Sequence, residues 1–214
     1  MKEINKIFIE DYKVNNENYF FALIKVCILG YLFLKGFFIS DDVTIHMKYG
    51  FYSLAMVGIA LFATHIFGIR LWSFKKFSKS DVLIIIGVLI LSQGFDYLFE
   101  LIHPEPSLND MNLTNHFSKT PLWLLFISIS VIPALVEEVV IRGFIMRVLF
   151  RGHLFIGLIT SSMIFAILHD GNNIIEYIPY FVFGMLMGLA YLKTRRIEVP
   201  ILIHFFNNLL VVLL

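Results

Sequence analysis

Apolar residues in this chain form long runs, and polar residues collect in the short segments between them. A helix that crosses a membrane needs about 20 mainly apolar residues. The pattern therefore predicts an all-α fold, a polytopic transmembrane helix bundle of about seven spans. The predicted spans are residues 19–39, 49–69, 82–103, 122–146, 154–169, 174–192 and 197–214. The fifth and the seventh of these are the shortest.

Composition supports a membrane protein. Hydrophobic residues make up 58% of the chain and the mean hydropathy is +0.81, whereas soluble domains are about 45–50% apolar. The net charge of +1 gives no reason to expect a nucleic-acid partner. The single cysteine, Cys27, excludes an intrachain disulfide bond. With no soluble segment or internal repeat, residues 1–214 are predicted to form one integral membrane domain.

The first apolar run is too long for the apolar region of a signal peptide, so we expect it to remain as the first membrane helix. Lys and Arg alternate between the two sets of connecting segments, and such residues favour the cytoplasmic side. The rich set contains Lys2, Lys6, Lys13, Arg70, Lys75, Lys76, Lys79, Arg147, Arg151, Lys193, Arg195 and Arg196. The poor set contains Lys48 and Lys119. This pattern predicts a cytoplasmic N-terminus and an external C-terminus. Abundant Phe, Ile, Lys and Asn suggest an AT-rich bacterial genome, and hence a bacterial plasma membrane.

Three charged residues interrupt the fourth apolar run: Glu137, Glu138 and Arg142. A charge at the centre of a membrane helix costs about 2.5–3.5 kcal/mol, so these side chains should face protein or a water-filled cavity. Glu138 and Arg142 are four residues apart and can pair on one helix face. A structural ion pair between helices explains these two residues well. It leaves Glu137, rotated by about 100° on the helix, without a partner and free to point into a cavity.

Two later spans also contain polar residues. His169 ends the fifth span, and His204 and Asn208 share one face of the last. Taken singly, His169 suits an interfacial role and the other two suit interhelical hydrogen bonding. Together with Glu137 they suggest chemistry. A carboxylate and a histidine can activate water, and an amide or protonated histidine can stabilise an oxyanion. Alternatively Glu137, His169 and His204 could hold a divalent metal such as zinc, and the residue types do not separate these routes.

Other patterns of membrane proteases are missing from the sequence. It contains no His-Glu-x-x-His zinc motif and no Gly-x-Ser-x-Gly nucleophile motif. Asp96 lacks a second membrane aspartate with which to form an aspartyl dyad. A transporter that uses the buried charges as a relay is disfavoured because no paired repeat is present.

The segments Glu137-Glu138-x-x-x-Arg142, Phe165-x-x-x-His169 and His204-x-x-x-Asn208 resemble, in this order, the three motifs of the CAAX-protease and bacteriocin-processing family (CPBP, Abi or Rce1-like membrane endopeptidases). The resemblance covers residues 122–214 and implies a catalytic core there. It implies that Glu137 activates water with help from His169. It further implies that His204 and Asn208 stabilise the oxyanion, while Glu138 and Arg142 hold the site together. The family is described both as metal-dependent and as a metal-free glutamate protease, and we favour the metal-free reading.

The expected function is therefore that of an intramembrane endopeptidase whose substrate is a peptide or a lipidated protein. A non-catalytic bacteriocin-immunity protein is the alternative, and membrane lipid is a partner in either case. The predicted spans conflict with this function in one respect. His169 falls nearer the outer end of its span than Glu137 and His204 do, so convergence requires that the fifth helix tilts or begins deeper in the membrane.

Overall fold

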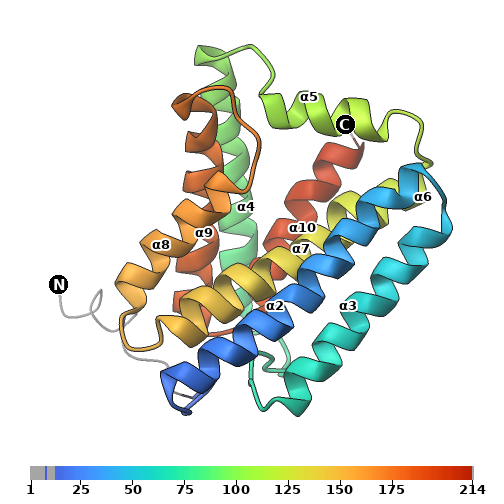
Figure 1. The fold of residues 1–214 in the computed structure, drawn as a ribbon. Helices are drawn as coiled ribbons and strands as arrows, with labels where there is room; N and C mark the ends of the chain where they lie inside the picture. Colours follow the sequence, from blue (N-terminus) through green and yellow to red (C-terminus); the bar gives the residue numbers. More distant parts are fainter. Residues whose placement is uncertain (1–7, 9–12, 214) are drawn as a thin grey trace.

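The computed structural model describes residue 8 and residues 13–213. Lys2 and Lys6, which contribute to the predicted orientation, and Leu214 lie outside the described residues. The described part of the chain is helical and contains no strand. Figure 1 shows a bundle of slanted helices with one short helix lying across one end. The all-α prediction is therefore confirmed.

The helices closely follow the apolar runs. The membrane-type helices are α2 (Tyr19–Asp41), α3 (Lys48–Ile66), α4 (Lys79–Ile102), α8 (Leu154–Ile167), α9 (Ile178–Thr194) and α10 (Glu198–Leu213). A further continuous helix, Leu122–Leu149, comprises α6 (Leu122–Leu125), η2 (Phe126–Val131), α7 (Ile132–Glu138) and η3 (Val139–Leu149). The connecting segments contain η1 (Asp42–Thr44), α5 (Leu108–Phe117) and η4 (Ile174–Tyr177).

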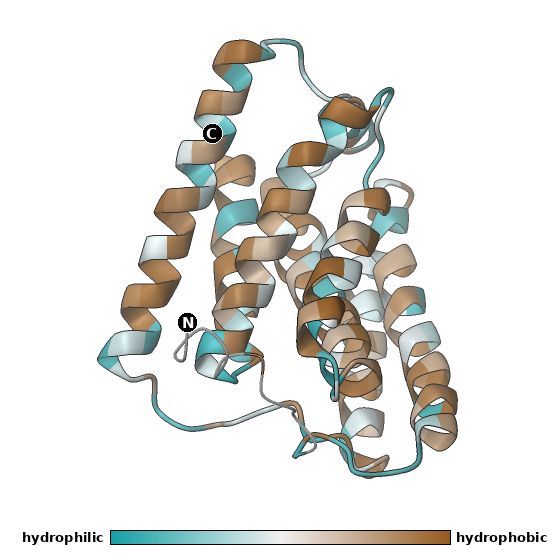
Figure 2. Cartoon of the chain, turned by 90° about the vertical axis from the view of Figure 1, so that its left-hand side faces the viewer, coloured by the Kyte–Doolittle hydropathy of each residue, from teal (hydrophilic) through white to brown (hydrophobic). Residues whose placement is uncertain are grey.

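Within the described residues, 5 helices are long and apolar enough to cross a membrane. The helices α8 and α10 are apolar but shorter, with 14 and 16 residues. At about 1.5 Å per residue they extend roughly 21–24 Å, less than the ~30 Å of a bilayer core. Large apolar side chains are exposed along the helices, for example Leu83 and Ile90 on α4, and Figure 2 shows the helices largely apolar along their lengths. Such a surface suits lipid, and the chain is an integral membrane protein.

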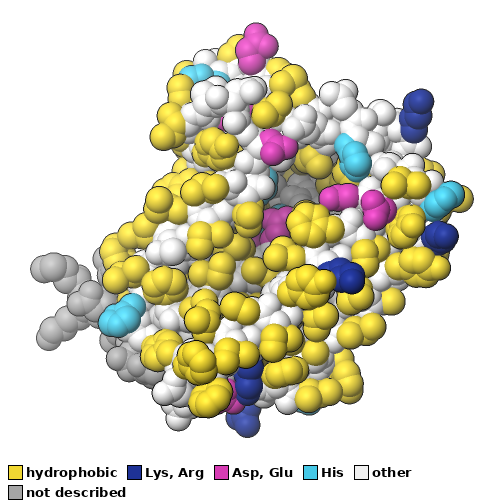
Figure 3. Space-filling view, in the orientation of Figure 1, with side chains coloured by type: hydrophobic (Ala, Val, Ile, Leu, Met, Phe, Trp, Pro, Cys, Tyr) yellow, Lys and Arg dark blue, Asp and Glu magenta, His cyan; other side chains and the backbone are white. Residues whose placement is uncertain are grey.

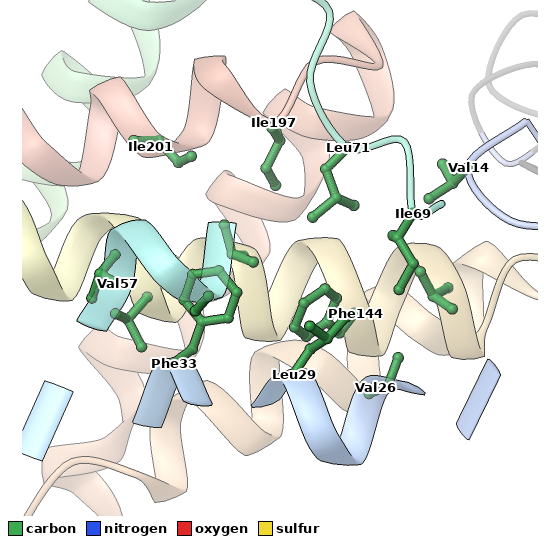
Figure 4. Packing of buried hydrophobic residues seen from close by; sticks show 14 of the residues in the cluster. Val14, Val26, Leu29, Phe33, Val57, Ile69, Leu71, Phe144, Ile197 and Ile201 are labelled. Atoms are coloured by element: carbon green, nitrogen blue, oxygen red, sulfur yellow. The ribbon is translucent and has the colours of Figure 1, made fainter. Parts of the chain in front are cut away.

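Helix α10 lies at the centre of the packing. It contacts η2 and α7 on one side and α4 and α9 on the other. Helix α8 packs between η3 and α9, and α2 packs against α3, α7 and η3. Figure 4 shows the largest apolar cluster, in which Phe33 of α2 lies 5.8 Å from Phe144 of η3 between ring centroids. The last three membrane helices thus surround the segment that carries Glu137, Glu138 and Arg142.

The polar segment 109–115, which lies between the third and fourth predicted spans, forms most of α5. The Ser107 side chain accepts a hydrogen bond from the backbone N–H of Asp110, so it caps the first turn. Phe117, at the other end, is buried against Val43 and Leu124. A cap at one end and an apolar anchor at the other thus help to hold this helix in a polar stretch.

Candidate active site

A buried cluster of charged side chains joins α7, η3 and α10. Glu138 Oε1 accepts hydrogen bonds from Arg142 Nη1 at 3.1 Å and from His204 Nδ1 at 3.0 Å. The side chains of Glu138 and Arg142 are fully buried and that of His204 nearly so. The predicted pairing of Glu138 with Arg142 is present, and His204 joins it from α10. Glu138 Oε2 is buried and accepts no hydrogen bond from a described residue.

Arg142 extends this cluster to α8 and α9. Its Nη2 donates to the carbonyl oxygen of Gly184 at 3.0 Å, and its guanidinium lies 4.6 Å from the centroid of the Phe165 ring. A Cβ atom at Gly184 would lie 3.1 Å from the backbone of Ser162, so glycine permits this close approach of α9 to α8. Sequence reasoning missed Gly184, because a backbone carbonyl that accepts a hydrogen bond leaves no mark in a pattern of side chains.

Glu137 has a different environment from Glu138. It is half-buried, and none of the hydrogen bonds or ion pairs among the described residues involves its side chain. It nevertheless lies close enough to His204, Glu138 and Arg142 for their charges to interact with its own. The structure therefore leaves one carboxylate unpaired beside a carboxylate that is bonded twice.

His169 approaches the same cluster from the end of α8. Its Nδ1 lies 2.9 Å from the carbonyl oxygen of Phe165, and since a carbonyl only accepts, Nδ1 carries a proton. The ring stacks on Tyr180 of α9, with centroids 4.0 Å apart and planes at 18°. In the neutral ring Nε2 then holds a lone pair. Sequence reasoning missed Tyr180, because one aromatic residue among many in an apolar span gives no distinct signal.

Phe165 explains how His169 reaches the cluster. Its ring centroid lies 4.8 Å from that of His169 and 5.8 Å from that of His204. His169 is also near enough to His204 and Arg142 for their charges to interact. The short helix α8 ends at Ile167 and leaves His169 one turn beyond Phe165. The predicted depth conflict therefore disappears, because α8 packs between η3 and α9 and ends beside the cluster.

Asn208 lies one turn beyond His204 and faces the same long helix. Its Nδ2 donates to the carbonyl oxygen of Ile129 at 2.9 Å. Pro133, four residues after Ile129, has no N–H with which to form the usual helical bond to that carbonyl. The helix is π-helical over the residues just before Pro133. Asn208 thus satisfies a backbone group that proline left without its α-helical donor, and one N–H of its amide remains.

Asn207, the neighbour of Asn208, makes hydrogen bonds that join two helices. Its Oδ1 accepts from Gln93 Nε2 at 2.9 Å and from Ser92 Oγ at 3.3 Å. Both partners lie on α4, so Asn207 joins α10 to α4. This agrees with the expectation that polar side chains within these spans hold helices together.

The candidate metal ligands do not gather into a ligand set. No group of three or more His, Cys, Asp or Glu side chains in the described chain is arranged to hold a metal ion. Both candidate histidines, His169 and His204, use Nδ1 in bonds within the protein and keep Nε2 available. The described side chains as placed do not form a three-ligand metal site, and the proposed reaction has no step that passes through a metal.

A polar cavity opens at the end of the bundle that carries α5. Its volume is about 590 Å³, and Asp41, Asn112, His116 and Asp170 are among the residues that line it. Asp170 directly follows His169, and its carboxylate accepts from Asn112 of α5 at 2.7 Å. Figure 3 shows a hollow bordered by acidic side chains on an otherwise largely apolar face. Water can therefore reach this end of the bundle close to His169.

Comparisons with known proteins agree with the motifs. Residues 119–210 match the family described as type II CAAX prenyl endopeptidase Rce1-like. The membrane-embedded CAAX protease MroQ of Staphylococcus aureus (strain USA300) is 40% identical over 103 residues, which cover 44% of this chain and 40% of that protein. The UPF0177 protein YvdC of Lactococcus lactis subsp. lactis (strain IL1403) is 22% identical over 138 residues, covering 64% and 53%.

The chain thus spans about half the length, or less, of the curated relatives it matches. No solved structure matches it. The matched region contains every residue of the three motifs, and the structure brings the helices that carry them together. Residues 119–210 of this integral membrane protein, which contain the three motifs, therefore match the family described as type II CAAX prenyl endopeptidase Rce1-like.

Proposed function

We propose that this protein is an intramembrane endopeptidase that cleaves a peptide or a lipidated protein with water activated by Glu137. One observation carries the proposal. Glu138 is bonded to both Arg142 and His204, whereas Glu137 beside it has no hydrogen-bond partner among the described residues. A half-buried carboxylate with a free acceptor is suited to act as a general base.

In the proposed reaction, a water molecule gives one proton to Glu137 while its oxygen bonds to the carbonyl carbon of the scissile peptide. The carbon–nitrogen bond then breaks, and the leaving nitrogen takes up the proton that Glu137 accepted. The lone pair on His169 Nε2 can hold the attacking water in place. Tyr180 supports this role because its stacked ring fixes the plane of the imidazole.

Attack by water places a negative charge on the carbonyl oxygen of the scissile peptide, and hydrogen-bond donors on α10 stabilise this oxyanion. Asn208 uses one amide N–H for the Ile129 carbonyl and has a second available. His204 can donate from Nε2 when its ring is protonated. Donors held in place before the reaction contribute most to such stabilisation.

The substrate class and location belong to the same proposal. The substrate would be a membrane-associated peptide or lipidated protein, since the active site lies within a bundle that faces lipid. The S. aureus relative is named as a CAAX protease. We also propose a bacterial plasma membrane, from the abundance of Phe, Ile, Lys and Asn. A cytoplasmic N-terminus and an external C-terminus are proposed because Lys and Arg concentrate in alternate connecting segments.

The variant Glu137→Gln tests the proposal. Glutamine keeps the size of the side chain but cannot accept a proton from water, so cleavage should fall about 10²–10⁴-fold while folding is retained. Peptides released from a defined library by the purified protein are identified and counted by mass spectrometry. Glu105→Gln is the matched control, because Glu105 is exposed in a connecting segment and should retain full cleavage.

Full cleavage by Glu137→Gln would show that Glu137 is not the base. If neither the variant nor the native protein cleaved any peptide, while both protected cells from a bacteriocin, the chain would act by binding, as an immunity protein.

A further inference from the structure

The loop between α3 and α4 is basic and aromatic. Residues 70–79, called here the basic–aromatic loop, have the sequence Arg-Leu-Trp-Ser-Phe-Lys-Lys-Phe-Ser-Lys, with no acidic residue. Its four cationic residues are all exposed. Trp72 packs partly against the largest apolar cluster, but the other two aromatic residues of the loop do not fill a core. Phe74 and Phe77 are both exposed.

One end of the basic–aromatic loop is fixed to the long helix. Leu71 is only 1% exposed and packs against Gly143 of η3, where a Cβ atom would lie 3.0 Å from its Cδ1. Arg147 Nη1 donates to the carbonyl oxygen of Leu71 at 2.7 Å. The loop therefore has a defined position next to the segment that carries Glu138 and Arg142.

The start of α10 fixes the rest of the loop. Glu198 Oε1 accepts hydrogen bonds from the backbone N–H groups of Ser73 and Phe74, at 2.7 and 3.0 Å. Arg196 donates to the carbonyl oxygens of Lys75 and Lys76. It also pairs with Asp81, at 3.2 Å. These side chains are largely buried, so they satisfy the loop backbone from inside and direct its side chains outward.

Phe74 is the most exposed aromatic residue of the loop, and its backbone conformation is unusual. Its φ of 51° lies in the left-handed region that non-glycine residues rarely adopt. The surrounding bonds maintain this conformation, and the ring is 86% exposed. Its closest aromatic neighbour is Trp72, with centroids 6.1 Å apart. A strained backbone conformation that leaves an apolar ring exposed to the surroundings indicates a functional role for Phe74.

We infer that the basic–aromatic loop binds anionic phospholipid headgroups at the membrane surface. Lys75, Lys76 and Lys79 supply cations for the phosphate groups, and the aromatic rings suit the headgroup level of the bilayer. The nearest acidic side chains, Asp81 and Glu198, are already bonded to Arg196 or to the loop backbone. The positive charge of the loop is therefore uncompensated on its outer side, and a negatively charged lipid surface complements it.

Lipid bound at this loop would also stabilise the active-site helix. Arg196 precedes α10 and Glu198 begins it, so the loop and α10 share these two side chains. Ordering the loop therefore orders the start of the helix that carries His204. Thermal stability of the whole protein is thus a readout of lipid binding that is independent of peptide cleavage.

The experiment measures the melting temperature of the purified full chain in neutral detergent. Added phosphatidylglycerol should raise it by about 2–4 °C more than equal phosphatidylcholine does. The double variant Lys75→Gln/Lys76→Gln should lose most of that difference. Its control, Lys48→Gln/Lys119→Gln, removes two exposed lysines from the other set of connecting segments and should keep it.

A second variant tests the inference in a protein that is expected to remain folded. Phe74→Gly relieves the left-handed backbone and removes the ring, so the protein should melt at least as high without lipid but respond less to phosphatidylglycerol. Equal stabilisation by both lipids, or by inorganic phosphate at matched ionic strength, would overturn the inference. So would an equal loss of response in the two lysine double variants.

Discussion

Two adjacent glutamates have opposite environments in this protein. Glu138 turns toward α10 and is bonded to Arg142 and His204, whereas Glu137, one residue earlier, makes no such bond with a described residue. The cause is the rotation of about 100° per residue along a helix. The same rotation that bonds one carboxylate into the ion cluster leaves the other beside the cluster without such a bond. Position on the helix, rather than residue type, therefore separates the two roles that we propose, a structural one for Glu138 and a chemical one for Glu137.

The variant Glu138→Gln should lose thermal stability as well as activity. It leaves Arg142 buried and charged without its carboxylate, and breaking a buried pair typically costs about 3–5 kcal/mol. It also removes the charge that holds His204 Nδ1. Melting in detergent and product yield on one peptide substrate measure the two effects.

Glu137→Gln serves as the comparison, because it should lose cleavage with little change in melting. If Glu138→Gln melted like the native protein, the buried cluster would not be the structural centre described here. If both variants failed to accumulate, the cluster would be structural as a whole and the catalytic proposal would fail.

At the scale of the elements, close helix approach positions the cluster. Arg142 reaches a backbone carbonyl of α9 only because Gly184 lets α9 lie against Ser162 of α8. Small residues at such crossings are typical of membrane helices, where packing replaces the hydrophobic driving force. The π-helical turns before Pro133 also help to position the site, since the carbonyl oxygen of Ile129 in these turns accepts a hydrogen bond from Asn208.

Gly184→Ala should therefore destabilise the protein by about 1–3 kcal/mol, the usual cost of overpacking. The added Cβ meets the Ser162 backbone, which cannot rotate away, and moves the carbonyl that Arg142 uses. Activity should fall with stability, measured by melting and by peptide cleavage. Gly94→Ala on α4 is the control, because a Cβ atom there meets nothing within 4 Å. Equal behaviour of the two variants would mean that α8 and α9 are less closely packed than described.

At the scale of the whole molecule, the two ends of the bundle differ in charge. The end that contains the basic–aromatic loop also contains Arg147, Arg151 and Arg196, which contact the backbone of other segments. The other end carries α5 and the polar cavity. This asymmetry is the basis of the proposed orientation.

Cysteine labelling can test this orientation. In a Cys27→Ala background, Lys76→Cys should react with membrane-impermeant reagents only after the membrane is opened, whereas Asn115→Cys should react in intact cells. Both positions are exposed, so burial does not limit the reaction. The reverse pattern would invert the orientation and place the cavity beneath α5 on the cytoplasmic side.

The apolar runs by themselves determined the helices and their order, because burying an unpaired backbone in lipid is so costly that long apolar segments must be helical. The three motifs also indicated the family, which the match over residues 119–210 confirms. The pairing of Glu138 with Arg142 followed from their spacing of four residues on one helix.

Only the tertiary structure decided how the helices meet. The contacts of His204 with Glu138, of His169 with Tyr180 and of Asn208 with Ile129 join residues on different helices. Such contacts depend on helix rotation and crossing, which packing sets and which local sequence does not encode. Helix α5 and the strained Phe74 depend on caps and on distant side chains such as Glu198. Local energetics thus determined the elements, and long-range packing determined the site.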